Sequence, residues 1–412
     1  MNRTSRRLAK IPESATVELT DRLAAATAAG RRITNLAGGD PDFATPAHIV
    51  HAATRALAAG RTHYGPSRGI PSLREAIAEE LRDTGVHRDP LTDVLVTASA
   101  KFALSLALQA VLDPGDEVLV LTPAWVSYVP LVRLHGGVAV PVDLNPARDY
   151  EITAADLQHA CGSRTKAILV NTPTNPTGRV LAEAEIAAVI SVATAADLTV
   201  ISDEVYRHIV FRGRHFSPSE IAPDRTVVVD GTSKGYAMTG WRLGWLTGPA
   251  DIVAVALTAH QHMVSCAPTF IQDAGVAALT GPTEPVAEMV ATYAARRRQL
   301  IDALAGAPGV SLMPPQGTFY AYLDVSGTGL TGTEFSDWLV EDAGVAVMPG
   351  QAFGDPMDSH IRMSLALPTA ALEAALAALR RSLDFRAHRD AGGSAGALLP
   401  HCLSAPFNPP CP

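Results

Sequence analysis

A lysine and an arginine stand eight positions apart in a segment rich in small residues. Lys234 and Arg242 lie within GTSKGYAMTGWRLGW, Gly231–Trp245, shortly after the β-branched run Thr226–Val229. A tight turn after a buried strand can place an amine on the floor of a cleft, where it can form a Schiff base with an aldehyde. A nearby guanidinium suits an oxyanion such as a phosphate. We therefore expect Lys234 to hold an aldehyde cofactor and Arg242 to bind its phosphate, although a solvated lysine and a surface arginine would also fit this pattern alone.

A phosphate site could also form where a buried helix begins. Val94–Thr97 is a run of strand-forming residues, and the pattern from Lys101 to Leu112 is apolar almost all round, which predicts a deeply buried helix. Backbone N–H groups at a helix N-terminus bind anions, so Ser99, Ala100 and Lys101 could cradle a phosphate. Ser99 could equally serve only as an ordinary N-cap.

Two more strand-like runs are followed by residues that suit a flat ring. Trp125 follows Glu117–Leu121 and could stack on an aromatic ligand, although most tryptophans simply pack in the core. Ala167–Val170 leads into NTPTNPTG, Asn171–Gly178, where two prolines and a glycine fix Asn175 as a hydrogen-bond donor. Asn-Pro pairs are also common in ordinary turns, so a purely structural role stays open for both features.

The apolar run Leu198–Ser202 is followed by a carboxylate. Asp203 comes directly after this run, and a buried carboxylate is costly unless it is paired. A protonated ring nitrogen would pair it, and Tyr206 could reach a hydroxyl of the same ring. The alternative for Asp203 is to cap a following helix. Together with Lys234, five strand ends each offer one part of a single site.

Strand-like and helical patterns alternate through the middle of the chain. Unbroken Val/Ile/Leu runs separated by helical patterns predict a mostly parallel sheet covered on both faces, and such sheets bind ligands at the carboxyl ends of their strands. We predict an α/β protein with a three-layer αβα large domain and a smaller α+β domain. The expected division is an N-terminal arm and part of the small domain in 1–45, the large domain in 46–285, the small domain in 286–385 and a disordered tail in 386–412.

The composition excludes several function classes. The 412 residues suffice for about two domains, with 47% hydrophobic and 18% charged residues, as in a soluble globular protein. A net charge of −8 argues against nucleic-acid binding, and no apolar run approaches the length of a membrane span. The four cysteines are scattered without metal-ligand spacing, so we expect no metal and a reducing cytoplasm.

Several segments together resemble fold-type I pyridoxal-phosphate (PLP) aminotransferases, in particular the class I bacterial-type aspartate/prephenate aminotransferases. They follow the order of that family over about residues 11–383. The matching segments are SATV (14–17), LAGGDPDFATP (36–46), YGPSRG (64–69), PAWVSY (123–128), NTPTNPTG (171–178), SDEVY (202–206), SKGYAMTGWRLGW (233–245) and IRMSLA (361–366).

The resemblance implies roles around the cofactor ring. Lys234 would bind PLP as a Schiff base and later move the proton between the substrate Cα and the cofactor, which requires a pKa well below the usual lysine value. Asp203 would keep the pyridine nitrogen protonated. Asn175 and Tyr206 would bind the ring's 3′-oxygen, and Trp125 would stack on the ring.

The resemblance also implies roles at the phosphate and the substrate. The residues near the phosphate would be Ser99, Ala100, Lys101, Ser233 and Arg242, with Tyr64 reaching the phosphate of a neighbouring subunit in a homodimer. Gly39 and Arg362 would bind the α-carboxylate of the substrate, Arg362 as a two-point fork, and Trp125 and Asn175 would also be substrate-binding residues. Thr16 and Lys101 could contact a distal carboxylate.

Two positions depart from the family pattern. Gly231 stands where many relatives have a serine, so phosphate binding would depend on Arg242, Ser233 and the loop at Ser99. Pro12 stands where some relatives specific for acidic substrates have a basic residue, so aspartate-like and aromatic or specialised amino acids both stay open as donors.

The expected reaction is ping-pong transamination, in which an amino acid gives its amine to the cofactor and a 2-oxo acid takes it back. Two alternatives stay open. The same fold supports PLP-dependent lyase or cyclase chemistry on a specialised amino acid, because the cofactor supplies the electron sink. A non-enzymatic PLP-binding regulator would need an attached DNA-binding domain, for which we see no segment in this sequence.

Overall fold

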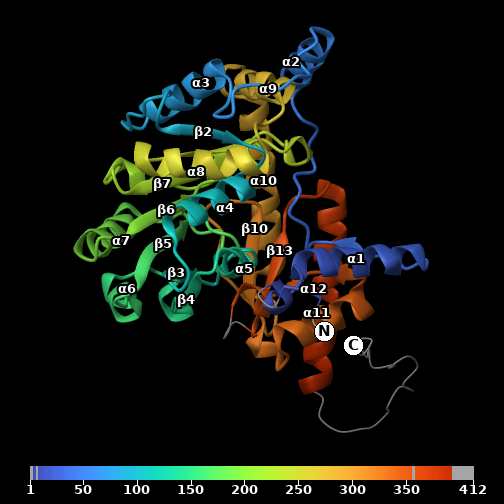
Figure 1. The fold of residues 1–412 in the computed structure, drawn as a ribbon. Coiled ribbons are helices and arrows are strands. Elements are labelled where there is room, and N and C mark those ends of the chain that lie inside the picture. The colour runs from blue at the N-terminus through green and yellow to red at the C-terminus, as the bar shows by residue number, and fades with distance from the viewer. Residues whose placement is uncertain (1–2, 6–7, 355–357, 392–412) are drawn as a thin grey trace.

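The computed structural model describes residues 3–5, 8–354 and 358–391, and its largest element is a seven-stranded sheet (Figure 1). The strand order is β2-β8-β7-β6-β5-β3-β4; β8 is antiparallel to both of its neighbours, and the other neighbours are parallel. The predicted, mostly parallel sheet is therefore confirmed. The strands are β2 Val94–Thr97, β3 Glu117–Thr122, β4 Val138–Asp143, β5 Thr165–Asn171, β6 Thr199–Asp203, β7 Thr226–Gly231 and β8 Gly244–Thr247.

Helices cover both faces of this sheet. Val118 and Val120 of β3 lie in a core with α4 Ala100–Val111 and α8 Ala250–Met263. Leu119, between them, lies in a second core with α6 Ala154–Ala160 and α7 Glu183–Ala195. Alternate residues of a strand point to opposite faces, so these two cores confirm the three-layer αβα arrangement. The remaining helices of this part are α2 Ala47–Ala58, α3 Pro71–Arg82, α5 Tyr128–Leu134 and α9 Thr269–Thr280.

A second, smaller group of elements lies beside the large sheet (Figure 1). A four-stranded antiparallel sheet has the order β12-β13-β10-β9, and a short parallel pair joins β1 to β11. The pairing of β1 with β11 supports the proposed assignment of the N-terminal segment to the small domain. The elements are β1 Thr34–Asn35, β9 Ser311–Leu312, β10 Tyr320–Asp324, β11 Val345–Ala346, β12 Met348–Pro349, β13 His360–Ser364, α1 Ala15–Ala28, α10 Glu284–Leu304, α11 Gly332–Ala343 and α12 Thr369–Ala391.

The structure differs from the expectations near the end of the chain. Helix α12 continues to Ala391, so residues 386–391, which we expected to belong to the tail, are helical. After Leu383 the apolar helical pattern gives way to mostly polar residues, and this change hid the extension of the helix in the sequence. The rest of the expected tail, 392–412, lies outside the described residues. Within the described residues, we find no helix that is long and apolar enough to cross a membrane.

The strand register brings the predicted residues together. Asn171 at the end of β5 pairs with Asp203 at the end of β6, and Asp203 pairs with Val229 of β7. The carboxyl ends of these three parallel strands therefore meet at one edge of the sheet, which is where an α/β sheet binds ligands.

Candidate active site

One pocket of about 390 Å³, a size typical of small-molecule sites, lies at this edge. It is lined by thirteen of the fourteen residues that we predicted. The exception is Tyr64, which is 89% exposed and does not line the pocket of its own chain. The thirteen are Thr16, Gly39, Ser99, Ala100, Lys101, Trp125, Asn175, Asp203, Tyr206, Ser233, Lys234, Arg242 and Arg362.

Lys234 occupies the turn after β7, as the sequence predicted. Its Nζ donates a hydrogen bond of 2.5 Å to the carbonyl oxygen of Gly39, which belongs to a segment far away in the sequence. Burial lowers the pKa of Lys234, and the charges of Arg362 and Arg242 lower it further against the opposing effects of Tyr320 and Asp40. A lysine with a lowered pKa is more often unprotonated, and this makes it a better nucleophile and base.

Asp203 is a buried carboxylate without a strong cationic partner. Burial raises the pKa of Asp203 to about 6, and hydrogen bonds from the Tyr128 hydroxyl and the Val205 N–H, together with the charge of Lys234, only partly oppose this rise. The Tyr128 bond is 2.8 Å long and the Val205 bond is 3.4 Å long. No helix follows Asp203 directly, so the helix-capping alternative is wrong. The carboxylate is therefore available to a cation in the pocket.

Arg362 is almost fully buried and lies on β13, a strand of the smaller sheet. Its Nη1 donates to Asn175 Oδ1 at 3.0 Å, and its Nη2 donates to the carbonyl oxygen of Ala37 at 2.7 Å. Its Nε is buried without a hydrogen-bond partner, and its guanidinium carbon lies 4.1 Å from the ring centre of Tyr320. Because Asn175 accepts this bond through Oδ1, its amide NH₂ is directed toward other groups. The arrangement leaves a buried cation with unused capacity to bind an anion.

The region predicted for a phosphate is positively charged. Ser99 Oγ accepts a 3.1 Å hydrogen bond from the Phe102 N–H, so Ser99 is the N-cap of α4, which places the free N–H groups of that helix at the pocket. Lys101 Nζ lies 4.8 Å from the ring centre of Trp125. Burial and the charges of Arg242 and Lys234 lower the pKa of Lys101.

Close backbone packing explains why a glycine occupies position 231. Gly231 pairs with Gly244 across β7 and β8. A Cβ on Gly231 would lie 2.7 Å from the carbonyl oxygen of Leu243 and 2.9 Å from the Gly244 Cα. A Cβ on Gly244 would lie 2.2 Å from the backbone nitrogen of Ala100. These two glycines let β8 pack directly against the N-terminus of α4, and a serine side chain at position 231 would force the strands apart.

Nine residues of the pocket wall were not predicted as site residues, among them Asn171, Tyr128, Asp40 and Tyr320. Asn171 is the first residue of NTPTNPTG, and Tyr128 is the last of PAWVSY, so both lay in segments that we had identified without assigning them a role. Asp40 accepts a 2.5 Å hydrogen bond from the Thr239 hydroxyl. Tyr320, whose hydroxyl lies 3.4 Å from that of Tyr206, comes from β10, and no strand-end argument for the large sheet could reach it.

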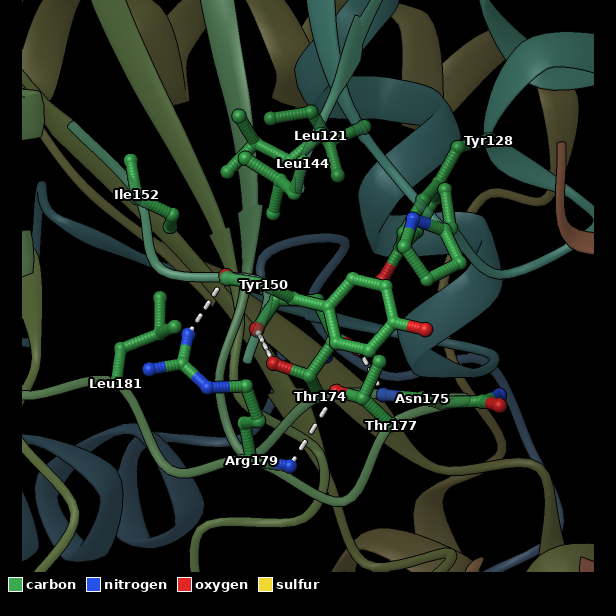
Figure 2. A pocket seen from close by; sticks show the side chains of 14 residues that line it. Leu121, Tyr128, Leu144, Tyr150, Ile152, Thr174, Asn175, Thr177, Arg179 and Leu181 are labelled. Carbon is green, nitrogen blue, oxygen red and sulfur yellow. Dashed lines mark hydrogen bonds between the residues drawn. The ribbon is translucent and has the colours of Figure 1, made fainter. Parts of the chain in front are cut away.

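A second, small cavity shares Tyr128, Asn171 and Asn175 with the first pocket as lining residues (Figure 2). Its volume of about 20 Å³ has room for one water molecule and excludes a substrate. Around it, Arg179 Nη1 donates to the carbonyl oxygen of Tyr150 at 2.8 Å, and the Asn175 N–H donates to Asn171 Oδ1 at 2.8 Å. These bonds hold the Asn171–Gly178 loop against the large sheet and thereby fix Asn175.

Comparison with known proteins adds independent information. Residues 31–379 match the family described as aminotransferase class I and II. The aspartate/prephenate aminotransferase of Thermus thermophilus is 38% identical over 93% of this chain and 99% of its own length. An arginine–pyruvate transaminase of Pseudomonas aeruginosa is 39% identical over 82% of this chain and 86% of its own. The solved structure of Thermus thermophilus aspartate aminotransferase with maleate superimposes with a TM-score of 0.89 at 38% identity, covering 93% of this chain and all of the other.

Proposed function

The chain belongs to the aminotransferase class I and II family, and on that premise we propose that its pocket binds PLP and prefers an acidic amino acid as donor. The family assignment confirms the resemblance seen in the sequence and the transfer of an amino group to a 2-oxo acid. One observation carries the proposal. A single pocket holds a lysine of lowered pKa, a buried carboxylate without a strong cationic partner and a buried arginine with an unpaired donor.

The chemistry of these residues fits PLP. The Lys234 amine suits the aldehyde, and the Asp203 carboxylate suits a protonated ring nitrogen because no strong cation of the chain pairs with it. Arg242 and the N-terminus of α4 suit the phosphate, because a guanidinium and the free N–H groups of a helix N-terminus both bind oxyanions. The residues present are therefore the ones that this cofactor requires.

Each residue would perform a distinct task during the reaction. When bound, PLP would supply an electron sink for the bonds at the Cα of an amino acid. Lys234 Nζ would accept the proton that leaves Cα and return it, which its lowered pKa supports. Asp203 would hold a proton at the ring nitrogen. Arg362 and Gly39 would orient the α-carboxylate, since Arg362 offers a fixed fork of donors.

The charge of the outer pocket supports an acidic donor. Lys101 adds positive charge to the pocket, and Thr16 offers a hydroxyl on α1. A donor with a second carboxylate would find complementary groups there, whereas an aromatic donor would depend on Trp125 and Tyr320. Lyase or cyclase chemistry remains the alternative use of the same cofactor.

A donor screen tests this proposal. Purified protein with PLP would receive aspartate, glutamate, phenylalanine or arginine together with 2-oxoglutarate or oxaloacetate, and the new 2-oxo acid would be measured by mass spectrometry. We expect the highest kcat/KM with aspartate or glutamate, and a loss of that preference in Lys101→Met. Faster turnover of phenylalanine or arginine would contradict the acidic preference, and elimination products in place of 2-oxo acids would favour a lyase.

The homodimer and the cytoplasmic location stay predictions. The exposure of Tyr64 outside its own pocket supports a role in a neighbouring subunit. A dimer in sedimentation experiments and weaker PLP binding in Tyr64→Phe would fit this role. A monomer with full activity would contradict it.

A further inference from the structure

The segment Leu36–Thr45, here called the Gly39 loop, joins the small sheet to the pocket. At its start, the Leu36 N–H donates to the carbonyl oxygen of Ala346 at 2.8 Å, and the Leu36 carbonyl accepts from the Ser364 N–H at 2.6 Å. In its middle, the Gly39 carbonyl accepts from Lys234. At its end, the Thr45 hydroxyl donates to the carbonyl oxygen of Ala237 at 2.7 Å. The loop therefore depends on both parts of the molecule for its position.

A buried arginine of α10 binds the carboxylate of Asp42 in this loop. Arg296 is only 4% exposed and donates to Asp42 through both terminal nitrogens, at 2.7 Å from Nη1 to Oδ1 and 2.8 Å from Nη2 to Oδ2. Its guanidinium carbon lies 5.3 Å from the ring centre of Phe43 and 5.6 Å from that of Tyr293. A two-point contact between a fork and a carboxylate fixes orientation as well as distance. Asp42 therefore has one defined position relative to α10.

The same guanidinium also contacts the segment after β13. Arg296 Nη1 donates to the carbonyl oxygen of Leu365 at 3.1 Å, and Nε donates to the Thr369 hydroxyl at 3.1 Å. Leu365 comes directly after β13, the strand that carries Arg362, and Asp42 follows Gly39 by three positions. One side chain therefore joins the two segments that provide the two groups assigned to the substrate α-carboxylate.

We propose that Arg296 is a positioning residue for amino-acid binding, which holds Gly39 in register with Arg362 through Asp42 and Leu365. This inference rests on the proposed function, because it assumes the carboxylate roles of Gly39 and Arg362. A direct bond from Arg362 Nη2 to Ala37 shows that the two segments already meet at the pocket. The Ser364 N–H also donates to the Leu36 carbonyl near the start of the loop, and Arg296 adds a connection at Asp42, beyond Gly39, so the loop is held on both sides of Gly39.

A purely structural ion pair is the competing explanation. Breaking a buried pair lowers stability, whatever the pair's role in the site. A positioning role also predicts a kinetic effect, because misplacing a binding group by about 1 Å can lower the rate about a hundredfold without unfolding the protein. The two explanations therefore differ in the kinetic constants and in the local mobility of the loop.

The test compares Arg296→Lys and Asp42→Asn holoenzymes with a matched control. Arg296→Lys keeps the charge but loses the fork, and Asp42→Asn keeps the shape but loses the charge. The control is Arg380→Gln, which removes an arginine that pairs with Asp384 at 3.0 Å and bonds the carbonyl oxygen of Ala305 at 2.9 Å without contacting the loop. We would measure kcat and KM for the donor identified in the screen, thermal unfolding, and hydrogen exchange of the amides in 36–45.

We expect kcat/KM to fall about 10- to 100-fold in Arg296→Lys and Asp42→Asn, chiefly through KM, with faster exchange in 36–45 and an unchanged visible band of the cofactor. We expect Arg380→Gln to change KM less than about twofold. If the KM values of Arg296→Lys and Asp42→Asn stay as close to the parent value as that of Arg380→Gln, the inference is overturned, even if stability falls. An unchanged KM in Arg362→Lys would overturn the carboxylate role of Arg362, and this inference with it, so the two failures are distinguishable.

Discussion

The substitution Asp203→Asn should stabilise the cofactor-free protein while it weakens the holoenzyme. In the folded protein, burial raises the pKa of Asp203 to about 6 from an ordinary value of 3.8. A raised carboxyl pKa means that the folded state binds the proton more tightly than the unfolded state does, so stability is lost as pH rises from about 3.8 through about 6 and stays low above that range. Two pKa units correspond to about 3 kcal/mol, which is the expected cost of the ionised carboxylate at neutral pH.

Urea unfolding of the cofactor-free protein at pH values from 4 to 8 would measure this effect. At pH 4 the free energies of unfolding of the parent and Asp203→Asn should differ far less than at neutral pH, because the folded carboxyl is still protonated and the unfolded one is only about half ionised. By pH 7.5 the variant should be more stable by up to about 3 kcal/mol, since its amide can still accept the Tyr128 hydrogen bond without carrying charge. A stability difference that does not change with pH would refute the reasoning. With PLP added, the variant should instead show lower affinity and activity, because the proposed ring-nitrogen partner is lost.

Two further predictions concern the walls of the pocket. Gly231→Ser should lower the free energy of unfolding by about 1–3 kcal/mol, because its Cβ would meet backbone atoms of Leu243 and Gly244. This variant and a control would be compared with the parent by thermal unfolding. The control Gly240→Ser, with no atom within 4 Å of its added Cβ, should have nearly the parent stability, and an equal loss of stability in both variants would contradict the packing argument. Tyr128→Phe removes a hydrogen bond that lowers the Asp203 pKa, so PLP affinity should fall about tenfold in equilibrium dialysis. Unchanged affinity would show that Asp203 does not depend on that hydroxyl.

Much of the large sheet could be predicted from its apolar runs. Val94–Thr97 forms the expected strand without any shift of its ends. Three of the other named runs, Glu117–Leu121, Ala167–Val170 and Thr226–Val229, extend at one end or both, and Leu198–Ser202 is shifted by one residue to Thr199–Asp203. Strand β8 was missed because Gly244–Thr247 is short and lies among glycines that resemble a turn. Tertiary pairing with two neighbours makes it a strand, and that pairing is not visible locally.

In the candidate site, too, some residues could be predicted from local sequence and others depend on tertiary contacts. Residues that follow parallel strands, such as Asp203 and Lys234, could be identified because strand ends meet at one edge. Tyr320 and Arg296 could not be found in this way, since each comes from the smaller group of elements and meets the pocket or its loop only after the chain folds back. The reason for Gly231 also lies in three dimensions, because the atoms that exclude a side chain belong to another strand.

Lys234 is the residue that we propose binds the cofactor covalently. The chain contains four lysines, Lys10, Lys101, Lys166 and Lys234, and of these only Lys101 and Lys234 line the described pocket. Borohydride reduction of the protein with PLP, followed by proteolysis and mass spectrometry, would identify the attachment site. We expect the cofactor mass on the peptide that contains Lys234 and no attachment in the pocket of Lys234→Ala. Attachment to Lys101 in the parent protein, or an unchanged visible band in Lys234→Ala, would rule out this role for Lys234.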